Sequence, residues 1–196
     1  MRIVKSMLLA ATMLGAATAA DARDLKFITI KIAPWAFEDP ETKAPIGAFP
    51  AIVAELEERT GHSISISMTP FARIDRELET GNQDCTIIIW NEERGRIVHK
   101  GSLVSDHLIG VIARKGLELK KYEDLQGMTI SVLRGLSLEK RFDADESLQK
   151  DVDRDYEMGL DKIHHHRLDA IAGAIPTIQY VAKEKGYDAD LGEYLV

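Results

Sequence analysis

Apolar and polar positions along the first half of the chain alternate between the period of strands and that of helices. The pattern predicts strands over 25–32, 63–68 and 84–90, and the last is a nearly continuous apolar run of the kind buried on both faces of a sheet. Helices are predicted over 49–60 and 71–80, and each is followed by a glycine suited to end a helix. This order of elements indicates a mostly parallel sheet covered by helices.

The pattern changes after Arg94 and then starts again. Residues 103–114 are predicted to form one or two extended segments, with a break near Asp106. A second alternating series follows, with strands over 128–133, 154–158 and 168–175 and helices from 137, over 160–166 and over 176–185. Two such series joined by extended segments indicate an α/β fold of two lobes, in which ligands gather at the carboxyl ends of the strands.

The first 20 residues have the layout of a secretory signal peptide. Arg2 and Lys5 precede a short apolar run from Met7 to about Leu14, and small residues with A-x-A-like cleavage sites follow. We therefore expect a leader over 1–20 that is cleaved rather than kept as an anchor. The whole chain has 25 Lys and Arg against 32 Asp and Glu, a net charge of −7, and cleavage would leave 23 cations and a charge of −9.

Composition narrows the class of protein. With 45% hydrophobic and 29% charged residues, the chain is typical of a soluble globular protein and unlike a disordered one. Its acidic balance argues against a generic affinity for nucleic acid or anionic membranes. The single cysteine, Cys85, cannot form an internal disulfide, and the apolar run CTIII around it predicts a buried, inert thiol.

Strong catalytic and cofactor motifs are absent from the sequence. It contains no GxxxxGK[ST], GxSxG, HExxH or CxxC motif, which weakens the nucleotide, hydrolase and zinc hypotheses. His164, His165 and His166 are consecutive, and neighbouring residues of a helix point about 100 degrees apart, so the three cannot all face one metal ion. We expect a solvated helix end there, no metal site and no cofactor.

Six segments, taken in order, carry a family resemblance over about residues 25 to 190. They are APWAF, IGAFPAIVAELEERTG, PFARIDRELETGNQD, NEERGRIVHKGSLVSDHLIGVIARKG, YEDLQGMTISVLRGLSLE and HHHRLDAIAGA. In this order and spacing they resemble the family 3 solute-binding proteins, periplasmic receptors for polar amino acids and related small molecules. The resemblance implies a two-lobed periplasmic-binding-protein-like (type II) fold with a hinge and a ligand cleft between the lobes. It implies lobe 1 over 21–112, lobe 2 over 113–187 and the start of a return to lobe 1 over 188–196.

Arg94 is the strongest candidate for ligand binding. It follows a predicted strand and a short polar turn, where its planar guanidinium can hold a carboxylate with two parallel hydrogen bonds. The resemblance implies that this arginine binds the ligand carboxylate, and the alternative is a surface arginine paired with Glu92 or Glu93. Asn91 and Trp90, in the same turn, join the predicted site, and Trp90 suggests a ligand less polar than a standard amino acid.

Four further residues complete the predicted binding site. Trp35 and Phe71 occupy the two positions where the resemblance implies aromatic side chains against the ligand, and ordinary packing between elements is the alternative for both. Gly135 and Ser137 lie after a strand and before a helix, where backbone N–H groups and a hydroxyl can meet an anion from the opposing lobe. Simple capping of the helix is the alternative for Ser137.

Three features depart from the family pattern. Ala174 stands where relatives that bind free amino acids have an acid for the ligand ammonium, so this partner is missing or is supplied from elsewhere. The stretch between Asp84 and Arg94 is about two residues short. The sequence ends at LGEYLV before the return to lobe 1 is complete, as expected of a fragment or of a protein that has lost the closing part of lobe 1.

The resemblance implies a monomeric periplasmic protein that captures a small carboxylate-bearing ligand for an ABC-type permease, with no nucleic-acid partner and no catalytic residue. One alternative is an enzyme similar to the periplasmic dehydratases of cyclic, prephenate-like acids. It would need a general acid or base, for which Glu92, Glu93, Asp106 and His107 are the nearby candidates. The other alternative is a ligand-sensing domain of a receptor.

Overall fold

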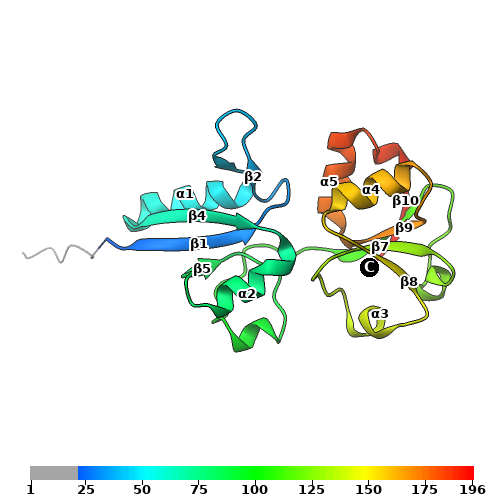
Figure 1. Ribbon diagram of the computed structural model, residues 1–196, viewed down its shortest axis with the longest axis horizontal. Coiled ribbons are helices and arrows are strands. Elements are labelled where there is room, and N and C mark those ends of the chain that lie inside the picture. The colour runs from blue at the N-terminus through cyan, green and yellow to red at the C-terminus, as the bar shows by residue number, and fades with distance from the viewer. Residues whose placement is uncertain (1–21) are drawn as a thin grey trace, which may run out of the picture.

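The structure, a computed structural model, describes residues 22–196. They form two α/β lobes that lie side by side, the first coloured blue to green and the second green to red (Figure 1). The two-lobed α/β architecture predicted from the sequence is therefore confirmed. The expected leader over 1–20 lies outside the described residues, and none of the helices within 22–196 is long and apolar enough to cross a membrane.

The first lobe is built on a small parallel sheet. Its elements are β1 (Asp24–Ile30), β2 (Phe37–Glu38), β3 (Pro45–Ile46), α1 (Ala48–Thr60), β4 (Ser63–Thr69), η1 (Phe71–Arg73), α2 (Ile74–Glu79), β5 (Cys85–Thr86) and η2 (Arg94–Arg96). β1 lies between β4 and β5 and runs parallel to both. Because successive strand residues point to opposite faces, Phe27 packs with α1 and Ile28 with α2. The two helices therefore cover opposite faces of the sheet (Figure 1).

The second lobe contains a larger, mixed sheet. Its elements are β6 (Ile109–Arg114), η3 (Tyr122–Leu125), β7 (Thr129–Leu133), α3 (Lys140–Ala144), β8 (Gln149–Asp153), α4 (Tyr156–His164), β9 (Ala170–Ala174), α5 (Ile175–Lys185), η4 (Asp188–Asp190) and β10 (Leu191–Leu195). The strand order is β10-β6-β9-β7-β8. β7 pairs in parallel with β8 and β9, whereas β6 runs antiparallel to β9 and β10. Helices α4 and α5 lie together on one face (Figure 1).

Two segments, β6 and β10, belong to the second sheet, whereas the expected lobe boundaries divide the first and assign the other to lobe 1. All of β6 belongs to the second sheet, so that sheet begins at Ile109 rather than after residue 112. Residues 191–195, expected to begin a return to lobe 1, form β10 and pair with β6 of the second sheet. An extended segment needs partners for its backbone N–H and C=O groups, and the open edge of β6 supplies them.

The predicted buried strand over 84–90 is wrong. Only Cys85–Thr86 pair as a strand, residues 87–89 are half-buried, and Trp90 is 39% exposed. The segment pairs only with β1 and lies at the edge of the sheet, so one side of it has no neighbouring strand within the described residues. Cys85 is exposed, which corrects the expected buried thiol. The pKa of this thiol is nevertheless raised, first by its partial burial and then by the charge of Asp84.

The predicted strand over 154–158 is also wrong, because a helix starts there. The Asp155 carboxylate accepts the Met158 N–H at 2.9 Å and caps α4, so helix begins at Tyr156. The strand of this region is β8, over the preceding five residues. Its sequence, QKDVD, has few apolar side chains because β8 is the edge strand of the sheet. Composition alone therefore favoured the wrong segment.

The segment that connects the lobes has neither helix nor strand over residues 99–108. It corresponds to the first part of the extended region predicted over 103–114, whose second part is β6. Leu103, Val104 and Leu108 on this segment are large apolar residues exposed by half or more. The lobes are thus joined by an extended chain with little packing of its own.

The loop that carries Trp35 is fixed to the start of α1. Phe49 N–H donates to the Trp35 carbonyl at 2.8 Å, and Ala48 N–H donates to the Pro34 carbonyl at 3.0 Å. Gly47 has a φ of 120°, and a Cβ added there would lie 2.7 Å from both carbonyl oxygens. Only glycine therefore fits between the loop and the helix.

Replacement of Gly47 by alanine is expected to lower the free energy of unfolding by at least about 1–3 kcal/mol, the cost of holding a side chain in such a backbone region. Gly61→Ala is the matched control, because Gly61 also has a positive φ (71°) but has nothing within 4 Å of an added Cβ. Urea denaturation of the two variants measures the difference. Equal losses of unfolding free energy in the two variants would mean that the close contact between loop and helix contributes nothing to stability.

Candidate functional site

The lobes touch at a boundary that contains three of the predicted site residues, and Phe71 and Gly135 provide its close packing. Phe71, in η1, is 5% exposed and shares an apolar cluster with Leu133 and Ile175 of the second lobe. Gly135 has a φ of 83°, and a Cβ added there would lie 2.8 Å from the Cα of Ala72. The backbone of the second lobe therefore lies directly against η1, just before α2.

Trp35 is the third predicted site residue at this boundary, and it contacts both lobes and the connecting segment. Its indole Nε1 donates to Thr177 Oγ1 at 2.8 Å, which ties the first lobe to the first turn of α5. Its ring stacks on Phe49 at 5.4 Å between centroids and meets the ring of His107 edge-on at 4.6 Å. Thr177 is buried. Trp35 is thus held in one orientation by a hydrogen bond and two aromatic contacts.

The guanidinium of Arg94 is buried at the edge of the first lobe, with 3% of the residue exposed. Its Nε and Nη2 donate to the two carboxylate oxygens of Asp75, at 2.7 and 3.2 Å, and its Nη1 donates to the Ile89 carbonyl at 2.6 Å. Its Cζ lies 5.2 Å from the centroid of the Phe71 ring. The charge is therefore neutralised by a paired carboxylate and covered by an aromatic face.

Two donors of Arg94 remain for other partners. An arginine side chain has five N–H groups. Three of them form the bonds to Asp75 and Ile89, so one on each Nη has no partner among residues 22–196. Two N–H groups of the guanidinium are therefore without a partner among the described residues, and 4% of the side chain is exposed.

Asp75 is the residue of this site that sequence reasoning missed. The alternative partners weighed for Arg94 were Glu92 and Glu93, but both are exposed and the ion pair is made with Asp75. The paired residues are 19 positions apart. No local spacing rule marks such a pair, and it arises only because α2 packs against the turn before η2.

Three other predicted residues have partners within their own lobe. Asn91 Oδ1 accepts the Arg94 N–H at 2.8 Å, and the Trp90 ring lies beside Gly95 with Lys100 Nζ 5.2 Å from its centroid. The exposed Ser137 hydroxyl donates to the Asp143 carboxylate. Helix α3 begins only at Lys140, so Ser137 does not cap it. A role toward a ligand stays a prediction for these three residues.

Tyr156 covers the place where the family resemblance implies an acid. Ala174 ends β9, and its N–H donates to the Tyr156 hydroxyl at 3.0 Å. Gly173 has a φ of 155°, and a Cβ added there would lie 2.3 Å from the Tyr156 hydroxyl oxygen, so the ring packs directly on the strand. Burial raises the pKa of Tyr156 to about 12, against a smaller lowering by the Ala174 N–H. A neutral phenol therefore occupies this end of β9.

The candidate acids and bases of the enzyme alternative are mostly exposed. Glu92, Glu93 and Asp106 are exposed, and the half-buried His107 has Nε2 3.1 Å from Ser105 Oγ. Among residues 22–196, no group of three or more His, Cys, Asp or Glu side chains is placed to hold a metal ion.

The histidine run at the end of α4 has separate partners. His164 Nδ1 lies 2.7 Å from Asp190 Oδ2, whereas His166 Nδ1 lies 3.2 Å from Arg114 Nη1. The His164 ring also stacks on Tyr187, with 4.1 Å between centroids. Helix α4 ends at His164 and His166 has a φ of 55°, so the helical spacing expected for the three residues does not apply, and the His164 and His165 rings meet edge-on at 5.1 Å between centroids.

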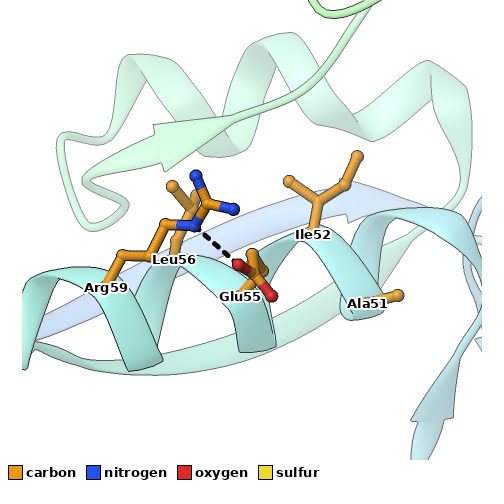
Figure 2. Close-up of a pocket in the computed structure, with 5 residues that line it drawn as sticks. All are labelled: Ala51, Ile52, Glu55, Leu56 and Arg59. Carbon is orange, nitrogen blue, oxygen red and sulfur yellow. Dashed lines mark hydrogen bonds and ion pairs between the residues drawn. The ribbon is translucent and has the colours of Figure 1, made fainter.

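Two surface hollows lie away from the predicted site. One, of about 400 Å³, runs along the outer face of α1, where Arg59 Nε and Glu55 Oε1 form an ion pair at 2.6 Å beside Leu56 and Ile52 (Figure 2). The other, of about 700 Å³, lies beside β10 and is lined by residues of β10 and of the segment after β6, among them Leu119 and Tyr194. Neither contains a predicted binding residue.

The contact between Trp35 and Thr177 is expected to contribute about 0.5–1.5 kcal/mol of coupling free energy, the range for a hydrogen bond within a protein. A double-mutant cycle of Trp35→Phe and Thr177→Val measures it by urea denaturation. Thr177→Ser keeps the hydroxyl and is the control. A coupling free energy near zero would mean that the lobes are not held by this bond.

Stability is expected to fall between about pH 10 and pH 12 because of Tyr156. Its folded pKa of about 12 lies above the ordinary value of 10.0. The stabilisation is therefore fully present below pH 10 and is lost as the pH rises toward 12. The loss amounts to about 2–3 kcal/mol. Tyr156→Phe removes this dependence, and denaturation curves across that range measure it against Tyr180→Phe as the control. An unchanged pH dependence in Tyr156→Phe would contradict the assignment.

Comparisons with known proteins reveal similarity in structure only. No family model and no curated protein sequence matches the chain. The Salmonella typhimurium periplasmic binding protein known for high arginine specificity is 20% identical, with a TM-score of 0.72 over 89% of this chain and 79% of its own. The substrate-binding protein of an amino acid ABC transporter is 20% identical, with a TM-score of 0.74 over 88% and 78%.

A ligand-binding domain is similar to the same degree. The AvGluR1 ligand-binding domain in complex with glutamate is 17% identical, with a TM-score of 0.75 over 89% of this chain and 79% of its own. At such identities the likeness establishes the fold. The chain therefore has the two-lobed periplasmic-binding-protein fold that its sequence resemblance implied.

Proposed function

We propose that this protein is a periplasmic solute-binding protein. It captures a small carboxylate-bearing ligand, an amino acid or a related organic acid, and presents it to an ABC-type permease. One observation carries the proposal: Arg94 is buried beside the lobe boundary, covers the ring of Phe71 and keeps two N–H donors uncommitted. Charge-assisted hydrogen bonds from such a buried guanidinium favour a carboxylate over a neutral group.

The other predicted residues take complementary parts in this proposal. Phe71 and Trp35 form apolar walls, and the backbone around Gly135 with Ser137 acts as a latch from the second lobe. Gly135 and Ala72 touch, and Trp35 bonds to Thr177, only while the lobes lie together. A ligand that contacts both lobes would therefore favour the closed arrangement, which couples binding to closure.

The structural neighbours support the amino-acid part of the proposal. Solved proteins of this fold include an arginine-specific periplasmic binding protein and a substrate-binding protein of an amino acid transporter. Export to the periplasm rests on the signal-peptide layout of residues 1–20. The likeness to the transporter neighbour supports a permease partner, and the binding neighbours favour a binder over an enzyme.

A ligand-sensing domain is a second candidate, favoured by the likeness to the AvGluR1 domain. Both candidates share the binding step and differ in what the closed form contacts. Deletion of the protein should abolish ligand uptake by cells if it serves a permease. Intact uptake with a lost cellular response to the ligand would favour sensing.

Arg94→Ala is expected to lose ligand binding. In a thermal-shift screen of amino acids, dicarboxylates and aromatic acids, the best ligand at about 100 times its Kd should stabilise the unaltered protein by about 2.7 kcal/mol. Arg96→Ala, an exposed change in the same turn, is the matched control and should keep that shift. If the ligand stabilises Arg94→Ala equally well, the carboxylate anchor is wrong.

A second variant tests whether a loss of binding in Arg94→Ala is caused only by misfolding. Arg94→Lys keeps the positive charge but loses the planar fork, so we expect weakened binding with the same ligand ranking.

Mass spectrometry of the ligand after incubation with the protein tests the dehydratase alternative, because a binding protein leaves the ligand chemically unchanged.

A further inference from the structure

The Asp75 carboxylate takes one whole edge of the Arg94 guanidinium. Nε and Nη2 of the arginine both donate to it, in the side-by-side geometry that a ligand carboxylate would use. The buried cation is therefore already neutralised without a ligand. A ligand carboxylate has to bind to the remaining N–H groups and so lies next to a carboxylate of the protein.

The Asp75 carboxylate can accept hydrogen bonds beyond this ion pair. Its side chain is 47% exposed, whereas that of Arg94 is 4% exposed. Each carboxylate oxygen has a lone pair beyond the one used toward the arginine. The outer side of Asp75 can therefore accept hydrogen bonds from another positively charged group.

Asp75 follows closely on the residues of the first lobe that meet the second lobe. It lies one helical turn after Phe71 and Ala72, and the second lobe approaches Ala72 through Gly135. On the opposing lobe, the end of β9 has Ala174 and the neutral phenol of Tyr156. Asp75 is thus the acid that touches the proposed carboxylate anchor.

These charges discriminate between classes of carboxylate. A simple acid or a dianion bound at Arg94 would face repulsion from Asp75, and like charges at a binding site are a common source of specificity. A ligand with an ammonium group beside its carboxylate would match both residues. Its carboxylate would bind Arg94, and its ammonium would donate to Asp75.

We propose that Asp75 is a specificity-determining residue that selects zwitterionic α-amino acids over carboxylates without an amino group. The inference rests on the proposed function and deepens it, because it names the ligand class of the same site. It assigns to helix α2 of the first lobe the ammonium partner that is absent at Ala174.

The test compares amino acids with the same skeletons lacking the α-amino group. The probe pairs are L-arginine with 5-guanidinopentanoate, L-glutamine with 4-carbamoylbutanoate, and L-glutamate with glutarate, measured by calorimetry. For the pair that binds, the unaltered protein should prefer the amino acid by at least about tenfold. Asp75→Asn keeps the size of the side chain and one acceptor for Arg94, and should reduce the preference to about twofold or less.

Two further variants complete the experiment. Glu79→Gln removes the same charge from an exposed position of α2 and should leave the preference unchanged. Asp75→Glu keeps the carboxylate and should retain most of the preference. If Asp75→Asn does not fold, the comparison in the unaltered protein still decides, because a preference below about threefold there overturns the inference.

Failure of the inference differs from failure of the proposed function. If Arg94→Ala abolishes binding but Asp75→Asn leaves the preference intact, the anchor stands and Asp75 is only the structural partner of Arg94. If no amino acid or carboxylate among the probes binds the unaltered protein, both the proposed function and the inference are overturned.

Discussion

Burial of the Arg94 charge is the constraint on which the region between the lobes depends. A guanidinium removed from water without a counter-ion costs several kcal/mol, and Arg94 is almost fully covered. Asp75 supplies the opposite charge and Ile89 supplies a carbonyl oxygen. Helix α2 and the turn before η2 must therefore lie against each other, and Ile74 and Leu78 of α2 add apolar packing against β1 and the neighbouring chain.

The same constraint orients the apolar surface that meets the second lobe. With Arg94 held against α2, its guanidinium covers one side of Phe71, whose side chain joins the core cluster of the second lobe. Trp35 and Thr177 add one hydrogen bond across the boundary. The chain that connects the lobes has little packing of its own. The lobes therefore meet through the apolar cluster around Phe71, against which Ile30, Ile32 and Ile88 of the first lobe also pack, and through this hydrogen bond.

Much of the fold could be predicted from local pattern. Helix α1 ends before Gly61 and α5 before Gly186, both in the left-handed backbone conformation that glycine adopts most easily. The errors lie at sheet edges. Residues 87–90 are apolar but pair with no strand among the described residues, and β8 has a polar sequence because it is an edge strand. Hydrophobicity indicates burial, but it does not show which strands become neighbours.

The sequence by itself determined the two series of strands and helices, the glycines that end them and the candidate arginine, because these follow from periodicity and side-chain chemistry. The tertiary structure decided the partners. Asp75 and Arg94 are 19 residues apart, and Trp35 and Thr177 are 142 apart. Such pairs depend on how complete elements pack, which no local spacing encodes. The acid beside the arginine, and with it the proposed choice of ligand, therefore became visible only in the folded chain.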